Sequence, residues 1–243
     1  MTRQLDLILK EGGADYDWQP ELEVVPKYLD EKGKGWLKEI LNELGGNGSL
    51  PLLEKLKFDF KLGRQLILWD DELHFHRYRL STLKSGLYED LNFLFTESYK
   101  RLCRTYEKEA LKAGMPQRIW SGPPVASTLF GKASEPGDFS ENGPTGWKLL
   151  AYNAAQIDLQ TRIHGYKLIR LNPYETIMTG GSLKRLDQLL INPKEEQRTM
   201  IYNWLMRKLG MSVTSILAAA SMVRWMTCSP ALTPFAAAVG PAD

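Results

Sequence analysis

Two histidines and a glutamate alternate along one short stretch of the sequence, ELHFH at 72–76. If this stretch is a β-strand, Glu72, His74 and His76 share one face, because strand side chains alternate between the two faces. Imidazole nitrogen and carboxylate oxygen are both good ligands for a divalent metal ion, and Tyr78 would lie beside them. The pattern predicts a metal site for hydrolytic chemistry. The alternative is a hydrogen-bonded histidine pair on a half-exposed sheet face.

The His-Phe-His segment resembles the metal-binding motif of a class of single-strand endonucleases. The resemblance covers three residues and implies a nucleophilic tyrosine on a nearby helix. The helix expected to follow carries Tyr88, Tyr99 and Tyr106, none of which has a lysine four residues later, as that class commonly shows. A metal-dependent nuclease or related phosphoesterase is therefore one hypothesis for the function.

A second set of residues is basic and has helical spacing: Lys100, Arg104, Lys108 and Lys112, with Arg101 beside them. Steps of four residues keep side chains on one stripe of a helix. Such a basic stripe is suited to meet successive phosphates of a nucleic acid. Glutamates in the same stretch give the alternative, which is a solvated face with ion pairs.

A third set lies in the sequence TGGSLKR at 179–185, where Gly180 and Gly181 precede Lys184 and Arg185. Glycines before a helix start expose backbone N–H groups that can hold a phosphate. We therefore expect these residues to bind nucleic acid, with an ordinary turn and a Ser182 cap as the alternative.

Aromatic residues near these bases could stack on the bases of a nucleic acid. Four of them flank expected loops rather than falling in apolar periods: Trp120, Trp147, Tyr166 and Tyr174. Packing in the core is the alternative for each of them.

The elements that must position these residues predict an α+β fold that is predominantly helical. Apolar residues alternate at 56–62, and further apolar runs at 65–69 and 72–80 complete a small antiparallel sheet of about 56–80. An additional strand is expected at 166–171. Helical periods at 3–11, 36–44, 82–113, 147–163, 182–191 and 193–209 predict the helices that pack against the sheet.

The chain divides by composition into four parts. Residues 1–118 form an N-terminal region with the β-meander and the long helix, and 119–146 form a loop or linker rich in Gly and Pro. Residues 147–210 form a helical region with one strand. Residues 211–243 are an apolar C-terminal arm.

The apolar arm must be covered by other protein surface, because a helix that is apolar on all sides is not stable in water. It could be a central helix of the domain, dock on another subunit or lie on a membrane surface. We expect a homo-oligomer that forms through 211–243.

Bulk properties exclude several classes of protein. The chain has 243 residues, 31 Lys and Arg against 29 Asp and Glu, and two cysteines. The cysteines are too few and too far apart for a disulfide framework or a zinc site. Neither a signal peptide nor a transmembrane segment is expected. These features predict a cytoplasmic protein with reduced thiols.

The favoured hypothesis is a non-enzymatic, self-associating nucleic-acid-binding protein that acts through phosphate contacts and needs no cofactor. The sequence does not separate RNA from DNA. The metal-dependent nuclease, with a divalent cation as its cofactor, is the alternative. A protein-interaction module is the second alternative.

Overall fold

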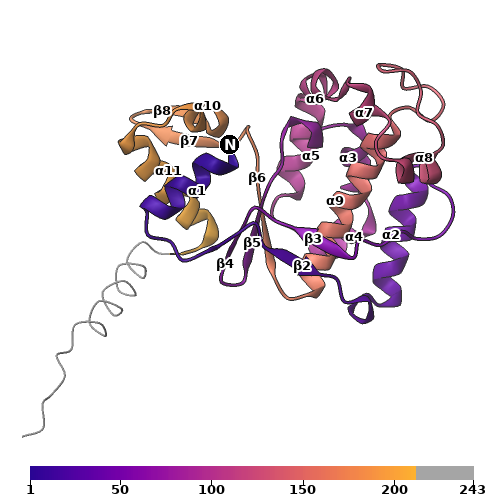
Figure 1. The fold of residues 1–243 in the computed structure, drawn as a ribbon, viewed down its shortest axis with the longest axis horizontal. Helices are drawn as coiled ribbons and strands as arrows, with labels where there is room; N and C mark the ends of the chain where they lie inside the picture. The colour runs from indigo at the N-terminus through magenta and orange to yellow at the C-terminus, as the bar shows by residue number, and fades with distance from the viewer. Residues whose placement is uncertain (212–243) are drawn as a thin grey trace, which may run out of the picture.

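The computed structural model describes residues 1–211. Within them, many helices surround a few short strands, so the prediction of a predominantly helical α+β fold is confirmed. Figure 1 shows two lobes that meet at the central sheet, a small one around α1 and α11 and a larger one around α9. The functional residues described below lie where these lobes meet.

The central sheet has four strands in the order β1-β4-β5-β6. β4 (Phe60–Leu62) pairs antiparallel with β1 (Asp17–Trp18) and with β5 (Gln65–Trp69). β6 (Lys167–Leu171) pairs in parallel with β5. A parallel pair requires a crossover connection, and here the crossover contains most of the larger lobe.

Both faces of the sheet are covered, because the strands alternate between two apolar clusters. Ile67 and Ile169 face a cluster formed with α1, α10 and α11 of the small lobe. Leu66 and Leu168 belong to another cluster, which contains Ile157 of α9. The strands are therefore apolar on both sides, and a charged side chain on them must find its partner inside the protein.

Helices of the small lobe come from both ends of the described chain. α1 (Thr2–Glu11) packs against α11 (Glu195–Leu209), and α10 (Leu186–Ile191) lies beside α1. The hairpin of β7 (Thr176–Thr179) and β8 (Ser182–Arg185) completes this lobe.

The larger lobe is built around α9 (Thr145–Ile163) and the helix α2 (Glu31–Glu43), which Asp30 caps by accepting a hydrogen bond from the N–H of Gly33 at 2.7 Å. An antiparallel pair of strands, β2 (Glu21–Glu23) and β3 (Lys55–Lys57), flanks them. Two 3₁₀ turns and six shorter helices fill the rest: η1 (Pro26–Tyr28), η2 (Glu72–His74), α3 (Arg77–Thr82), α4 (Gly86–Leu91), α5 (Thr96–Thr105), α6 (Glu107–Gly114), α7 (Gln117–Trp120) and α8 (Pro124–Phe130).

The expected third strand of the meander, at 72–80, is wrong. This stretch forms η2 and α3 instead, because two side chains cap the helical turns. Asp71 accepts a hydrogen bond from the N–H of Leu73 at 3.1 Å, and His76 accepts one from the N–H of Arg79 at 3.3 Å. The strands expected at 65–69 and 166–171 are confirmed, and β6 takes the place beside β5.

The single long helix expected at 82–113 is also wrong, because the chain breaks twice. Asn92 adopts the left-handed conformation at φ 47° and ends α4. Tyr106 separates α5 from α6 at φ −111° and ψ 18°. The helix expected at 182–191 begins only at Leu186, because Gly180 and Gly181 have positive φ and form the turn of the β7–β8 hairpin.

The segment 119–146, expected to be a loop or linker, contains α8 and contributes to the core. Trp120 and Phe130 are buried, and Trp120 contacts Trp147 edge-to-face with ring centroids 5.5 Å apart. The apolar arm lies outside the described residues apart from Met211, and with it the segment through which the homo-oligomer is expected to form. In residues 1–211, no helix is long and apolar enough to span a bilayer.

The close contact between α7 and α9 gives a test of the packing. A Cβ added to Gly146 would lie 2.1 Å from the carbonyl oxygen of Ile119, which is backbone and cannot rotate away. Gly146→Ala should therefore lower the free energy of unfolding by about 1–3 kcal/mol, measured by urea denaturation.

Gly35→Ala in α2 is the matched control, because a Cβ there meets no atom within 4 Å. This variant should gain up to about 1 kcal/mol from the higher helix propensity of alanine. An equal gain in both variants would show that α7 and α9 are not in close contact.

Candidate functional site

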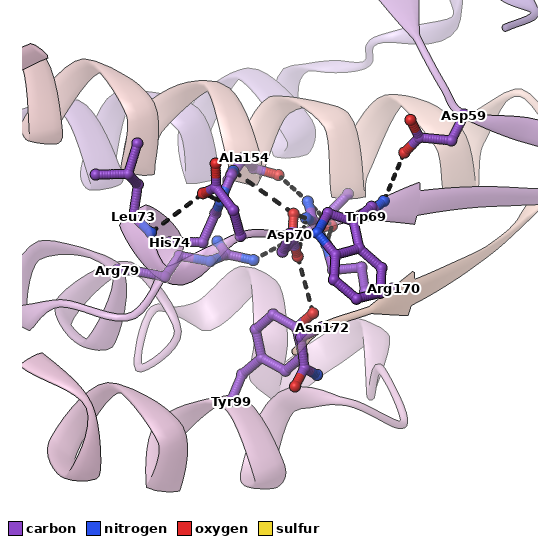
Figure 2. A network of polar contacts seen from close by, with 12 residues as sticks. Asp59, Trp69, Asp70, Leu73, His74, Arg79, Tyr99, Ala154, Arg170 and Asn172 are labelled. Carbon is purple, nitrogen blue, oxygen red and sulfur yellow. Dashed lines mark hydrogen bonds and ion pairs between the residues drawn. The ribbon is translucent and has the colours of Figure 1, made fainter. Parts of the chain in front are cut away.

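A buried arginine on β6, Arg170, joins two aspartates from distant parts of the chain, and Figure 2 shows it beside one of them, Asp70. The Nη1 group of Arg170 donates to both carboxylate oxygens of Asp70 at 2.7 Å, and its Nε donates to Asp158 at 2.8 Å. Asp70 follows β5, and Asp158 lies on α9. All three side chains are at most 1% exposed. Arg170 therefore connects the sheet to the helix that covers it.

A second arginine and a tyrosine complete the coordination of Asp158. Arg79 of α3 donates to Asp158 Oδ2 at 2.7 Å, and the hydroxyl of Tyr88 on α4 donates to the same oxygen at 2.5 Å. Arg79 also donates to the Tyr88 hydroxyl at 2.7 Å. Two arginines and two aspartates thus cancel in charge, as burial requires.

Asp70 has two further partners, Tyr99 and His74. The hydroxyl of Tyr99 donates to Asp70 at 2.8 Å, and His74 Nε2 lies 3.6 Å from Asp70 while its Nδ1 lies 2.9 Å from Asp71. Burial alone would raise the pKa of Asp70, but Arg170 and His74 outweigh it and lower that pKa. Burial alone would lower the pKa of His74, but Asp70 and Asp71 outweigh it and raise that pKa. These seven residues are called the ionic network: Asp70, His74, Arg79, Tyr88, Tyr99, Asp158 and Arg170.

A pocket of about 570 Å³ lies beside this network, and Tyr99 and Arg170 line it. Its walls come from the segment between α4 and α5, the end of α9, β6, and Lys208 of α11. The two lobes therefore meet at this site, which is called the β6 pocket. Its volume falls in the range of small-molecule and cofactor sites.

Basic side chains outnumber acidic ones in the β6 pocket. Arg101, Arg162 and Lys167 are exposed and line it. None of these three side chains forms an ion pair or hydrogen bond with any residue of the described part of the chain. The remaining cation of the pocket surface, Lys208, forms an ion pair with Glu175. The pocket thus offers three free positive charges to a ligand.

The structure separates the residues of the predicted basic stripe. Arg101 lies in the β6 pocket, whereas Lys100 forms an ion pair with Glu97 at 2.8 Å. Arg104 is exposed on α5, and Lys108 and Lys112 are exposed on α6, beyond the break at Tyr106. A single continuous stripe on one helix is therefore not formed.

Residues of the predicted glycine-rich site lie on the β7–β8 hairpin rather than at a helix start. Gly180 and Gly181 form its turn, and Lys184 is exposed. Arg185 bonds Asp187 and lies over the ring of Tyr174, 4.8 Å from its centroid. Tyr174 in turn stacks on Tyr106 with ring centroids 3.5 Å apart. Arg185 is thus the member of this set that reaches the wall of the β6 pocket.

The predicted metal ligands do not share one face, because their stretch is not a strand. Glu72 is exposed, His74 belongs to the ionic network, and His76 is fully buried beside Trp147. Burial, with the nearby charges of His74 and Arg79, lowers the pKa of His76 well below its ordinary value. No three His, Cys, Asp or Glu side chains within residues 1–211 are grouped to hold a metal ion.

Tyrosines and tryptophans singled out in the sequence fall into two groups. Tyr166 and Tyr174 line the β6 pocket, whereas Trp120 and Trp147 are fully buried in the core. Tyr88 and Tyr99, which the endonuclease resemblance suggested as nucleophiles, are buried and bonded to aspartates, and burial raises the pKa of both hydroxyls.

Sequence reasoning missed Arg162, Lys167 and the central residues of the ionic network. A usable signal existed for the network, because Arg170 interrupts the apolar run LIRL and Asp158 lies in a helix whose neighbours are apolar. A charge at a buried position must have a partner of opposite charge. No comparable signal marks Arg162 and Lys167, which look like ordinary surface residues.

Arg170→Met should lower the free energy of unfolding far more than the loss of a surface ion pair does. The substitution leaves the buried Asp70 without the arginine that neutralises it, and such a loss costs about 3–5 kcal/mol. The exposed pair of Lys34 and Glu31 is the control, and Lys34→Met should cost less than about 1 kcal/mol. Similar losses in the two variants, measured by urea denaturation, would contradict a structural role for the network.

His74→Gln tests the electrostatics of the same network. Because the folded state raises the pKa of His74 above 6.5, it binds a proton that the unfolded state has released. The stabilisation is therefore complete below pH 6.5 and is lost as the pH rises through the folded value. The free energy of unfolding of the wild type, relative to His74→Gln, should fall from pH 6 to alkaline pH. Parallel pH profiles would contradict this coupling.

The comparisons with known proteins give one match. A search of curated proteins and a search of solved structures each returned none. The model of a family described as a family of unknown function (DUF7255) matches residues 39–192. This range holds the whole ionic network and every lining residue of the β6 pocket except Lys208. Since the match covers more than half of the sequence, the chain belongs to this family of unknown function, DUF7255.

Proposed function

We propose that this protein binds nucleic acid at the β6 pocket, through its phosphates. The observation that carries the proposal is the placement of Arg101, Arg162 and Lys167, which come from three elements and line one pocket. Phosphate contacts supply most of the affinity of proteins for nucleic acids, because each contact releases condensed counterions.

The contrast between free and neutralised cations supports this proposal. Arg79 and Arg170 are buried and form ion pairs with aspartates, so their charges stabilise the fold and are not available to a ligand. Arg101, Arg162 and Lys167 have no such partners within residues 1–211. A free arginine can donate two parallel hydrogen bonds to a phosphate, which fixes the orientation of the ligand.

Aromatic side chains in the same pocket support nucleic acid over other polyanions. Phe93, Phe95, Tyr166 and Tyr174 line the pocket together with the cations. Bases stack on such rings, whereas a polyphosphate has no ring to stack on them. Charge and ring therefore meet at one site.

The remaining residues of the basic stripe extend this proposal beyond the pocket. Arg104 lies about one helical turn from Arg101 on α5, which places the two side chains on neighbouring positions of the helix surface. We assign Arg104 to the same phosphate-binding surface. Lys108, Lys112 and Lys184 are exposed cations outside the pocket lining, available to longer ligands.

The thiol of Cys103 supports a cytoplasmic location as part of the proposal. Cys103 has no cysteine partner within residues 1–211; it is buried, and burial raises the pKa of its thiol to about 12. A thiol in the reduced form is typical of proteins in a reducing compartment such as the cytoplasm, and its protonated form is unreactive.

Charge reversal in the pocket tests the proposed function. Arg101→Glu should weaken binding of a fluorescein-labelled single-stranded oligonucleotide by about tenfold or more, measured by fluorescence anisotropy. It should also make log Kd less steep in log salt, by about one phosphate contact. The titrations should span about 50–200 mM salt, where phosphate contacts dominate the change in affinity.

Arg3→Glu is the matched control, because Arg3 is an exposed arginine of α1 outside the pocket lining. It changes the net charge by the same amount and should leave Kd within about twofold, since distant surface charges are screened by salt. Equal losses in the two variants would mean that binding reflects overall charge. No binding by the wild type at low salt would refute the proposed function.

A further inference from the structure

The segment between α4 and α5 places three apolar side chains at the β6 pocket, and one of them is exposed to water. Phe93, Leu94 and Phe95 all line the pocket. Leu94 is 88% exposed, the highest value among the large apolar side chains of the described residues. An exposed leucine between two phenylalanines does not stabilise the fold, because its apolar surface is not buried.

The two phenylalanine rings are fixed by the ionic network. Phe93 packs against Tyr88 with ring centroids 5.5 Å apart, and Phe95 packs against Tyr99 at 5.1 Å. The hydroxyls of these tyrosines are bonded to Asp158 and Asp70. Phe93 and Phe95 also contact each other at 5.4 Å. Phe93, Leu94 and Phe95 are called the rim of the pocket. The rim is therefore an ordered apolar surface, and Leu94 projects from it.

Two of the free cations and the apolar segment between α4 and α5 lie on different walls of the pocket. Arg162 and Lys167 lie at the end of α9 and the start of β6, whereas Phe93, Leu94 and Phe95 lie between α4 and α5. A ligand that fills the pocket must present an anionic group and a flat apolar group side by side. A single nucleotide of a strand has both, and about 570 Å³ is a volume suited to a ligand of this size.

We infer that the β6 pocket takes an unstacked base of a single-stranded nucleic acid, with the base against the rim of Phe93, Leu94 and Phe95 and its phosphates at Arg162 and Lys167. The inference rests on the proposed function and names its ligand class. A duplex does not fit this arrangement, because its bases are stacked on each other and their faces are not accessible.

The experiment compares three ligands of equal length on the full chain by fluorescence anisotropy. They are a labelled single strand, the same strand annealed to its complement, and a strand of the same phosphates that lacks bases. The wild type should bind the single strand about tenfold more tightly than the abasic strand, since stacking on a side chain contributes this much or more per base. It should also prefer the single strand to the duplex.

Leu94→Ala tests the rim directly, and its high exposure makes a folding defect implausible. This variant should weaken binding of the single strand by about threefold or more and leave the affinity for the abasic strand unchanged. Leu183→Ala is the matched control, because Leu183 is 64% exposed on the β7–β8 hairpin and does not line the pocket.

The outcomes separate this inference from the proposed function. Equal binding of all three ligands, with Arg101→Glu still weakening it, would overturn the inference and leave phosphate binding in place. A preference for the single strand that Leu94→Ala does not change would overturn the rim as the base site. If none of the three ligands binds, the proposed function and the inference both fail.

Discussion

The fold depends on one buried charge, the guanidinium of Arg170. It reaches Asp70 at the end of β5 and Asp158 on α9, and so ties together the sheet, the crossover helix and, through Arg79, the helix α3. Arginine suits this position because its planar group can donate to two carboxylates at once and stays charged when buried. The arrangement is demanding, since each member becomes an unmatched charge inside the protein when its partner is lost.

The same constraint shapes the pocket beside it. Arg170 and Tyr99 belong to the ionic network and also line the β6 pocket. Their polar groups are already engaged with Asp70, so they give the pocket a rigid wall rather than free charge. The free charge comes from the exposed side chains of Arg101, Arg162 and Lys167. The proposed binding of a polyanion therefore combines a fixed wall with exposed charges around it.

Apolar patterns in the sequence predicted elements well where periodicity was unambiguous, as for α9, β5, β6 and α11. The errors share a cause, which is that local backbone features are not visible in the pattern of apolar residues. At 72–80 the alternation of types indicated a strand, but Asp71 and His76 cap helical turns, and local hydrogen bonds of this kind outweigh a weak period. At 82–113 the period continues across Asn92 and Tyr106, where the helix is interrupted.

Of the predicted site residues, Arg101 lies in the pocket and Arg185 at its wall. Arg162 and Lys167 could not be found, because only the tertiary fold places them in the same pocket as Arg101.

The small lobe has a consequence for how the chain is made. α1 packs against α10 and α11, and Glu11 bonds Arg198 across almost the whole described length. Because a ribosome releases the chain from its amino end, α1 emerges before α10 and α11 have been translated. Its buried face, with Leu5, Ile8 and Leu9, remains uncovered until these two helices have been synthesised. The small lobe can therefore close only after the whole of the larger lobe has been translated.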